Sequence, residues 1–202
     1  MHIEAVIFDF GGVLVRTENR EPRTNLAARL DMTYNELSGL IFDSPSAIQA
    51  MKGEITADQH WEEVRKSLGL SREELERVRM EFWAGDILDE ELVNLLRELR
   101  SRYQTVLLSN AWNDLRHMIE DVFQINDAFD RLVISAEIGL VKPDLVIYQW
   151  VLTELGVMPA KAVLVDDFLH NIEGAQAAGM HAIHFRSRDQ ALEELQGLLD
   201  KS

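Results

Sequence analysis

From residue 89 to residue 199 the sequence alternates between amphipathic stretches and short runs of β-favouring residues. Apolar residues three to four positions apart predict helices, and continuous apolar runs predict strands buried on both faces. The predicted strands are 104–108, 132–135, 162–165 and 182–185, and the predicted helices are 89–102, 114–123, 144–155, 171–178 and 190–199. Repeated units of this length predict a parallel sheet with right-handed crossovers.

A further strand is predicted near the start of the chain, where the apolar run 5–8 ends at Asp9 and is followed by Gly11 and Gly12. In open α/β sheets, ligands bind at the carboxyl ends of the strands. The two glycines allow backbone to approach closely whatever Asp9 holds. Asp9 is therefore a candidate functional residue, although an aspartate in this position also commonly caps a turn.

Between residues 16 and 85 the pattern is helical and no strand is predicted. Thr56 and Ser71 are expected N-caps, and Glu74 completes a capping box with Ser71. The predicted helices are 24–30, 34–42, 47–51, 57–68 and 72–83. The aromatic residues expected in the core of this helical part are Phe42, Trp61, Phe82 and Trp83.

These patterns predict an α/β fold: a doubly wound parallel sheet, built from residues 1–15 and 86–202, with an all-helical domain of residues 16–85 inserted. The 202 residues are 47% hydrophobic, which is enough for a packed core. A formal charge of −15 argues against nucleic acid and anionic membranes as partners. Without cysteine, a signal peptide or an apolar run long enough to span a membrane, the chain is expected to be cytoplasmic.

Polar residues follow two of the predicted strands, and a lysine lies in one of the predicted loops. Ser109 and Asn110 come directly before a predicted helix, where they either cap the helix or help its N-terminus bind an anion. Lys142 lies in a loop before Pro143, and its ammonium group could neutralise a phosphate.

Asp166 and Asp167 directly follow the buried run 162–165. Two adjacent carboxylates repel each other unless a cation lies beside them, and Mg²⁺ prefers such oxygen ligands. The pair could instead cap the next helix. Asp9 would join them if the strands 5–8 and 162–165 are neighbours, and that convergence would favour a metal site.

In order and context, these residues resemble the four motifs of the haloacid dehalogenase (HAD) superfamily. The resemblance covers essentially the whole chain, and residues 16–85 look like the small helical cap that many members insert after the first motif. The matching residues are Asp9-Phe10-Gly11-Gly12-Val13, then Ser109, then Lys142-Pro143, and finally Asp166-Asp167 with Asn171.

The resemblance implies a Mg²⁺-dependent phosphatase acting on a small phosphorylated metabolite. Asp9 would be the nucleophile and would form an aspartyl-phosphate. Mg²⁺ would be held by Asp9, by the backbone carbonyl of Gly11 and by Asp167, with Asp166 supporting the ion through water.

The resemblance also implies how the phosphoryl group would be held. Ser109, the backbone amide of Asn110 and Lys142 would surround it, and Asn171 would support Lys142 or the acidic loop. The helical cap would close over the site and select the substrate. Trp112, immediately downstream, is expected to line the pocket or to pack on the sheet.

The sequence departs from the motifs of the superfamily at Gly11. At this position most phosphatases of the superfamily carry a second aspartate that serves as general acid and base. Three explanations are open. The substrate has a good leaving group, such as a sugar-1-phosphate; or His170, Glu18 or a cap residue supplies the proton; or the chain is an impaired enzyme that serves as a binding or regulatory module. The name-giving 2-haloacid dehalogenases also lack this aspartate, but the pair Asp166-Asp167 favours phosphate and metal over a halogenated acid.

Overall fold

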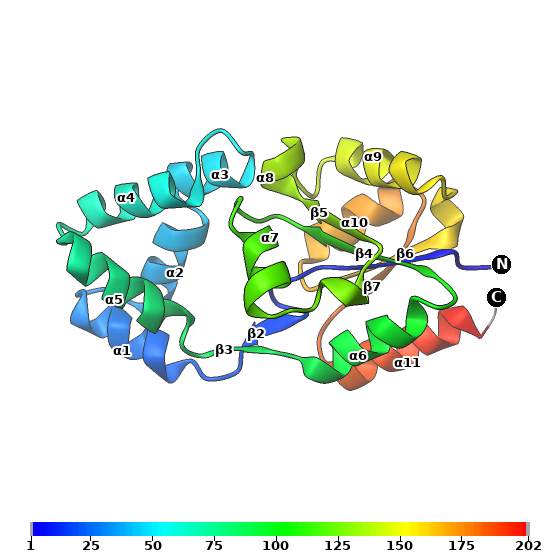
Figure 1. Cartoon of the computed structure of the whole chain (residues 1–202), viewed down its shortest axis with the longest axis horizontal. Coiled ribbons are helices and arrows are strands. Elements are labelled where there is room, and N and C mark those ends of the chain that lie inside the picture. The colour runs from blue at the N-terminus through cyan, green and yellow to red at the C-terminus, as the bar shows by residue number, and fades with distance from the viewer. Residues whose placement is uncertain (1, 201–202) are drawn as a thin grey trace.

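A five-stranded parallel sheet forms the centre of the larger part of the molecule in the computed structural model, which describes residues 2–200 (Figure 1). The order is β5-β4-β1-β6-β7, so β1 lies in the middle and pairs with both β4 and β6. The strands are β1 (Ala5–Phe8), β4 (Gln104–Ser109), β5 (Arg131–Ile134), β6 (Ala162–Asp166) and β7 (His181–His184). The predicted parallel sheet is confirmed.

Two helices cover each face of this sheet (Figure 1). On one face lie α6 (Glu90–Leu99) and α11 (Arg188–Leu199), and on the other lie α9 (Leu145–Leu155) and α10 (Leu169–Ala177). Alternate side chains of β1 enter the two separate apolar clusters, as the two-residue period of a strand requires.

Short helical segments connect these elements. The predicted helix 114–123 is instead a short α-helix followed by a π-helical turn, in which the Phe123 N–H donates to the carbonyl of Met118. The segments are α7 (Leu115–His117), η1 (Met118–Val122), η2 (Asn126–Ala128), α8 (Ser135–Ile138) and η3 (Pro159–Lys161).

Five helices, α1 to α5, gather on one side of the molecule around an apolar cluster of their own (Figure 1). Their bounds are α1 (Glu21–Arg29), α2 (Tyr34–Phe42), α3 (Pro45–Met51), α4 (Ala57–Ser67) and α5 (Arg72–Trp83). Complete capping boxes fix the starts of α2, α4 and α5. No helix of residues 2–200 has the length and apolar character needed to cross a bilayer.

A two-stranded ribbon lies where the chain enters and leaves the helical part. It is formed by β2 (Val15–Thr17) and β3 (Asp86–Leu88), which pair antiparallel. The expectation of no strand between residues 16 and 85 is therefore wrong at Arg16 and Thr17. Strands of three residues are too short for alternation to reveal them, and this ribbon depends on a partner about 70 residues away.

Candidate active site

Asp9 is held at the carboxyl edge of the sheet, one residue beyond β1. Phe8 is in register with Leu107 of β4 on one side and with Val165 of β6 on the other. The strand pairing therefore brings Asp166, the residue after Val165, level with Asp9. The adjacency of these two strands, on which the convergence of the carboxylates depends, is confirmed.

Lys142 supplies the positive charge at this edge. Its Nζ lies 3.0 Å from Oδ2 of Asp9 and 2.6 Å from Oδ2 of Asp166. It also donates to the backbone carbonyl of Leu108 at 2.8 Å. Because the lysine side chain is fully buried, these three acceptors hold its ammonium group between two carboxylates that would otherwise repel each other.

The pKa values of these groups reflect the crowding of charge. Burial raises the pKa of the Asp9 carboxyl to about 7, against the opposing effect of Lys142 and with a further contribution from Asp166. Burial and Asp166 likewise raise the pKa of Asp167 to about 6. Burial acts to lower the pKa of Lys142, but Asp9 and Asp166 outweigh it and the pKa rises. Three carboxylates face one ammonium group, so negative charge is in excess.

Asp166 and Asp167 are neighbours in the sequence with different surroundings. Asp166 is fully buried, and its two oxygens accept hydrogen bonds from Lys142, from the Phe168 N–H and from Nδ2 of Asn171. Asp167 is partly exposed, and its Oδ1 is buried without a hydrogen-bond partner. Asp166 therefore holds Lys142 in place, whereas Asp167 keeps an oxygen available for a ligand.

The carboxylates fit a hard divalent cation. Asp9, Asp166 and Asp167 each offer an oxygen within 4.8 Å of the others, and an all-oxygen donor set with excess negative charge suits Mg²⁺. Gly12 makes this arrangement possible, because its φ of +79° is left-handed and a Cβ there would overlap the carboxylate of Asp167.

The remaining predicted site residues lie at the same edge. Ser109 is the last residue of β4 and is buried. The Asn110 side chain binds the Lys142 backbone twice, since its Oδ1 accepts from the N–H and its Nδ2 donates to the carbonyl, both at 2.8 Å. The Asn171 amide donates to Asp166 at 2.9 and 3.1 Å. The side-chain amides of Asn110 and Asn171 therefore brace the site from within the protein.

Gly11 is exposed, and no atom lies within 4 Å of the position that a Cβ would take. Two residues were considered above as a replacement for the missing acid. Glu18 is exposed and pairs with Arg16 at 2.9 Å, and His170 is exposed on α10. Among the residues that the structure describes, neither is hydrogen-bonded to Asp9.

Trp112 lies in a different place from the one the sequence suggested. It is buried in the apolar cluster of α1 to α5, with its ring centroid 4.7 Å from that of His60 and 6.0 Å from that of Trp61. Trp112 follows the segment that carries Ser109 and Asn110. This loop therefore reaches from the sheet into the core of the inserted helices.

Two polar residues, which the sequence analysis did not identify, join the helical part to the same edge of the sheet. Oδ1 of Asn113 accepts from the Ala57 N–H at 2.8 Å, and the Ser135 hydroxyl donates to the Met51 carbonyl at 2.7 Å. The partners are 56 and 84 residues apart, so no local pattern could have shown these contacts.

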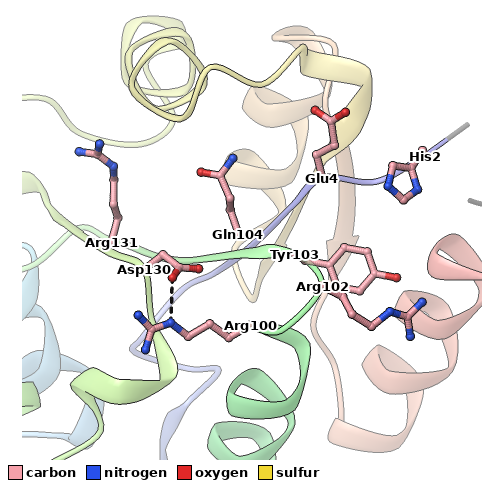
Figure 2. A pocket seen from close by; sticks show the side chains of 8 residues that line it. All are labelled: His2, Glu4, Arg100, Arg102, Tyr103, Gln104, Asp130 and Arg131. Atoms are coloured by element: carbon pink, nitrogen blue, oxygen red, sulfur yellow. Dashed lines mark hydrogen bonds and ion pairs between the residues drawn. The ribbon is translucent and has the colours of Figure 1, made fainter.

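A separate cavity of about 660 Å³ lies at the amino-terminal edge of the sheet (Figure 2). Arginine side chains line part of it, but Arg100 is paired with Asp130 at 2.8 Å and Arg131 with Glu154 at 3.4 Å. None of the residues that line this cavity is one of the predicted site residues, and the candidate active site lies at the opposite edge.

Comparisons with known proteins identify the family of this chain. The family model for haloacid dehalogenase-like hydrolases matches residues 3–179. A sesquiterpene phosphatase of Aspergillus oryzae is 30% identical over 197 residues, which cover 97% of this chain and 96% of that protein.

Solved structures share the fold. A predicted HAD-like family hydrolase from Porphyromonas gingivalis superposes with a TM-score of 0.82 at 20% identity, covering all of both chains. A HAD family enzyme from Bacteroides thetaiotaomicron, solved with magnesium and inorganic phosphate, has a TM-score of 0.75 at 22% identity and covers 92% of this chain and 96% of that one. The chain belongs to the haloacid dehalogenase-like hydrolases, as the sequence motifs predicted.

Proposed function

We propose that this hydrolase is a Mg²⁺-dependent phosphatase that acts on a small phosphorylated metabolite. The observation that carries the proposal is the Lys142 ammonium group between Asp9 and Asp166, with an unpartnered oxygen of Asp167 in the same cluster. A nucleophile, a fixed positive charge and a set of oxygen ligands thus lie together. The phosphatase from A. oryzae and the magnesium and phosphate complex from B. thetaiotaomicron support this proposal.

In the first step of the proposed reaction, a carboxylate oxygen of Asp9 attacks phosphorus, the bond from phosphorus to the leaving oxygen breaks, and that oxygen takes a proton from water. In the second step water attacks phosphorus, the bond to Asp9 breaks, and orthophosphate leaves. Lys142, Ser109 and the backbone N–H of Asn110 stabilise the charge on the phosphoryl oxygens.

The metal-binding residues in this proposal are Asp9, Asp167 and the carbonyl of Gly11, with Asp166 behind them. A bound Mg²⁺ would reduce the repulsion between the nucleophile and the phosphate. Because Gly11 carries no acid, the preferred substrates have leaving groups that need little protonation, such as sugar-1-phosphates.

Residues 16–85 act as the cap in this proposal. The cap excludes water from the site and contacts the part of the substrate beyond the phosphate. The contacts of Trp112, Asn113 and Ser135 with the helical part support a cap at the carboxyl edge of the sheet.

The test is phosphate release in Mg²⁺ from aryl phosphates, sugar-1-phosphates and sugar-6-phosphates. Asp9→Asn serves as the inactive variant, and Asp127→Asn, which changes an exposed aspartate of η2 at the other edge of the sheet, serves as the matched control. We expect turnover by the wild type and Asp127→Asn, strongest for aryl and sugar-1-phosphates, and none by Asp9→Asn or in excess EDTA.

Other results would contradict parts of the proposal. Activity that survives Asp9→Asn would refute the role of Asp9 as nucleophile, and activity that is unchanged in EDTA would refute the metal. Binding of inorganic phosphate in Mg²⁺ without turnover of any substrate would instead favour the impaired enzyme that serves as a binding module.

A further inference from the structure

Exposed apolar side chains follow two of the candidate site residues closely in the sequence. Ten large apolar residues are exposed in the part of the chain that the structure describes, and four of them follow Lys142 or Asp167 within four residues. Their exposed fractions are 43% for Leu145, 55% for Val146, 53% for Phe168 and 55% for Leu169. We refer to these four residues as the apolar rim.

The apolar rim belongs to the first turns of two neighbouring helices. Leu145 and Val146 begin α9, Phe168 is the N-cap of α10, and Leu169 is the first residue of α10. Both helices begin at the carboxyl edge of the sheet. The Tyr148 hydroxyl of α9 donates to the Asn171 carbonyl of α10 at 2.9 Å, so the two helices are packed together close to their first turns.

Phe168 is an unfavourable residue for its position in the fold. N-caps are normally Ser, Thr, Asp or Asn, whose side chains accept a hydrogen bond from the first turn. Phe168 makes no such bond. Its ring lies 5.2 Å from that of the exposed His170 and is itself 53% exposed, so burial in the core does not explain a phenyl ring there. Exceptions to local rules of this kind are concentrated at functional sites.

We infer that the apolar rim binds the leaving group of the substrate, and that the substrate is a phosphate monoester of an apolar phenol, which needs little protonation as it leaves. This inference rests on the proposed phosphatase function. A phosphoryl group held beside Asp9 and Lys142 would lie at the edge of the sheet where α9 and α10 begin, and we place its leaving group over the apolar rim at the first turns of these helices. Of the two kinds of leaving group that need little protonation, an apolar phenol would cover exposed apolar surface, whereas a sugar would lose hydration there without gaining hydrogen bonds. The inference therefore selects aryl phosphates over the sugar-1-phosphates that the missing acid alone would also allow.

The test separates apolar binding from leaving-group chemistry. A series of 4-alkylphenyl phosphates, from methyl to hexyl, lengthens the apolar part while the acidity of the phenol stays nearly constant. We expect kcat/KM of the wild type in Mg²⁺ to rise about two- to fourfold for each added methylene, where fourfold corresponds to complete burial. Calorimetric titration of alkylphosphonates, which cannot be hydrolysed by this route, should show the same trend in affinity.

Phe168→Ser is the informative variant, because serine is a good N-cap and the change should not unfold the protein. Met158→Ser is its matched control: Met158 is also an N-cap, is 61% exposed and precedes β6 at the other edge of the sheet. We expect Phe168→Ser to reduce the gain per methylene to half or less and Met158→Ser to leave it unchanged.

The inference and the proposed function fail in distinguishable ways. Turnover of the aryl phosphates without dependence on chain length, or with the same dependence in Phe168→Ser, would overturn the inference and leave the phosphatase intact. Phosphonate affinity that rises with the length of the alkyl chain, without turnover of any substrate, would refute the phosphatase activity and support the apolar site. Self-association of the wild type that Phe168→Ser abolishes, with no effect of chain length, would assign the apolar rim to a protein contact and overturn the inference.

Discussion

Replacing Gly12 with alanine should damage the candidate metal site, whereas the same change at the adjacent Gly11 should not. Gly12 has a φ of +79°, and in this left-handed region an alanine costs about 1–2 kcal/mol. Its Cβ would also overlap the carboxylate of Asp167, and overpacking of this kind costs about 1–3 kcal/mol. The expected loss of unfolding free energy is therefore about 2–5 kcal/mol.

The effect on metal binding follows from the same overlap. Relief requires the Asp167 carboxylate to move away from the cluster that it forms with Asp9 and Asp166, so the affinity for Mg²⁺ should fall about 10- to 100-fold. At Gly11 no atom lies within 4 Å of the added Cβ and φ is outside the left-handed region. Gly11→Ala should therefore change the unfolding free energy by no more than about 1 kcal/mol.

Urea unfolding and calorimetric titration with Mg²⁺ measure both quantities in the wild type and the two variants. The comparison controls for the loss of a glycine, because the two substitutions are identical and adjacent. If Gly12→Ala unfolds at the same urea concentration as Gly11→Ala and binds Mg²⁺ equally well, the reasoning that places Asp167 against Gly12 and in the metal site is wrong.

Three further predictions concern the missing acid, the base of the helical part and a buried histidine. Gly11→Asp should raise the rate on alkyl phosphates about 100-fold or more and change the rate on 4-nitrophenyl phosphate little, because only a poor leaving group needs a proton; equal effects on both substrates in a steady-state assay would contradict this. Arg23→Met leaves the largely buried Asp86 without its ion pair and should lower the free energy of unfolding, measured in urea, by about 3 kcal/mol. Arg29→Met, which breaks an exposed ion pair, should lower it by no more than about 1 kcal/mol. Equal losses would show that burial of the ion pair does not decide the difference. Burial lowers the pKa of His60, so below pH 6.5 the unfolded state binds more protons than the folded state. The wild type should therefore lose stability below pH 6.5 relative to His60→Gln. A difference in unfolding free energy between the two proteins that stays the same from pH 7.5 to pH 5.5 would refute this prediction.

Local sequence was sufficient for most of the secondary structure. The predicted helices 34–42 and 72–83 agree with α2 and α5 at both ends, because a capping box marks the start of each and the apolar spacing marks its length. The buried strands were found because short continuous apolar runs between turn residues are typical of strands that are covered on both faces. Motif order was enough to identify the family and to select Asp9, Lys142 and Asp167 as candidates.

The identity of the contacting partners could not be read from the sequence. Trp112 follows a strand of the sheet, so local reasoning assigned it to the pocket or the sheet. It is instead buried in a cluster whose helical members, from Leu26 to Phe82, lie 30 to 86 residues earlier in the chain. The same applies to the ribbon of β2 and β3, whose short strands exist only as a pair. Contacts of this kind are properties of the folded chain.

By itself the sequence determined the kinds of element, their order and the chemical groups available, because helices, strands and turns follow from interactions over a few residues. The tertiary structure decided which of those groups contact each other and which one keeps an oxygen available for a ligand. The strand order brought Asp9 beside Asp166, and the burial of Lys142 between them left Asp167 with a free oxygen. The physical reason is that burial and electrostatic neighbours depend on distances in space, and these arise only when segments far apart in the chain pack together.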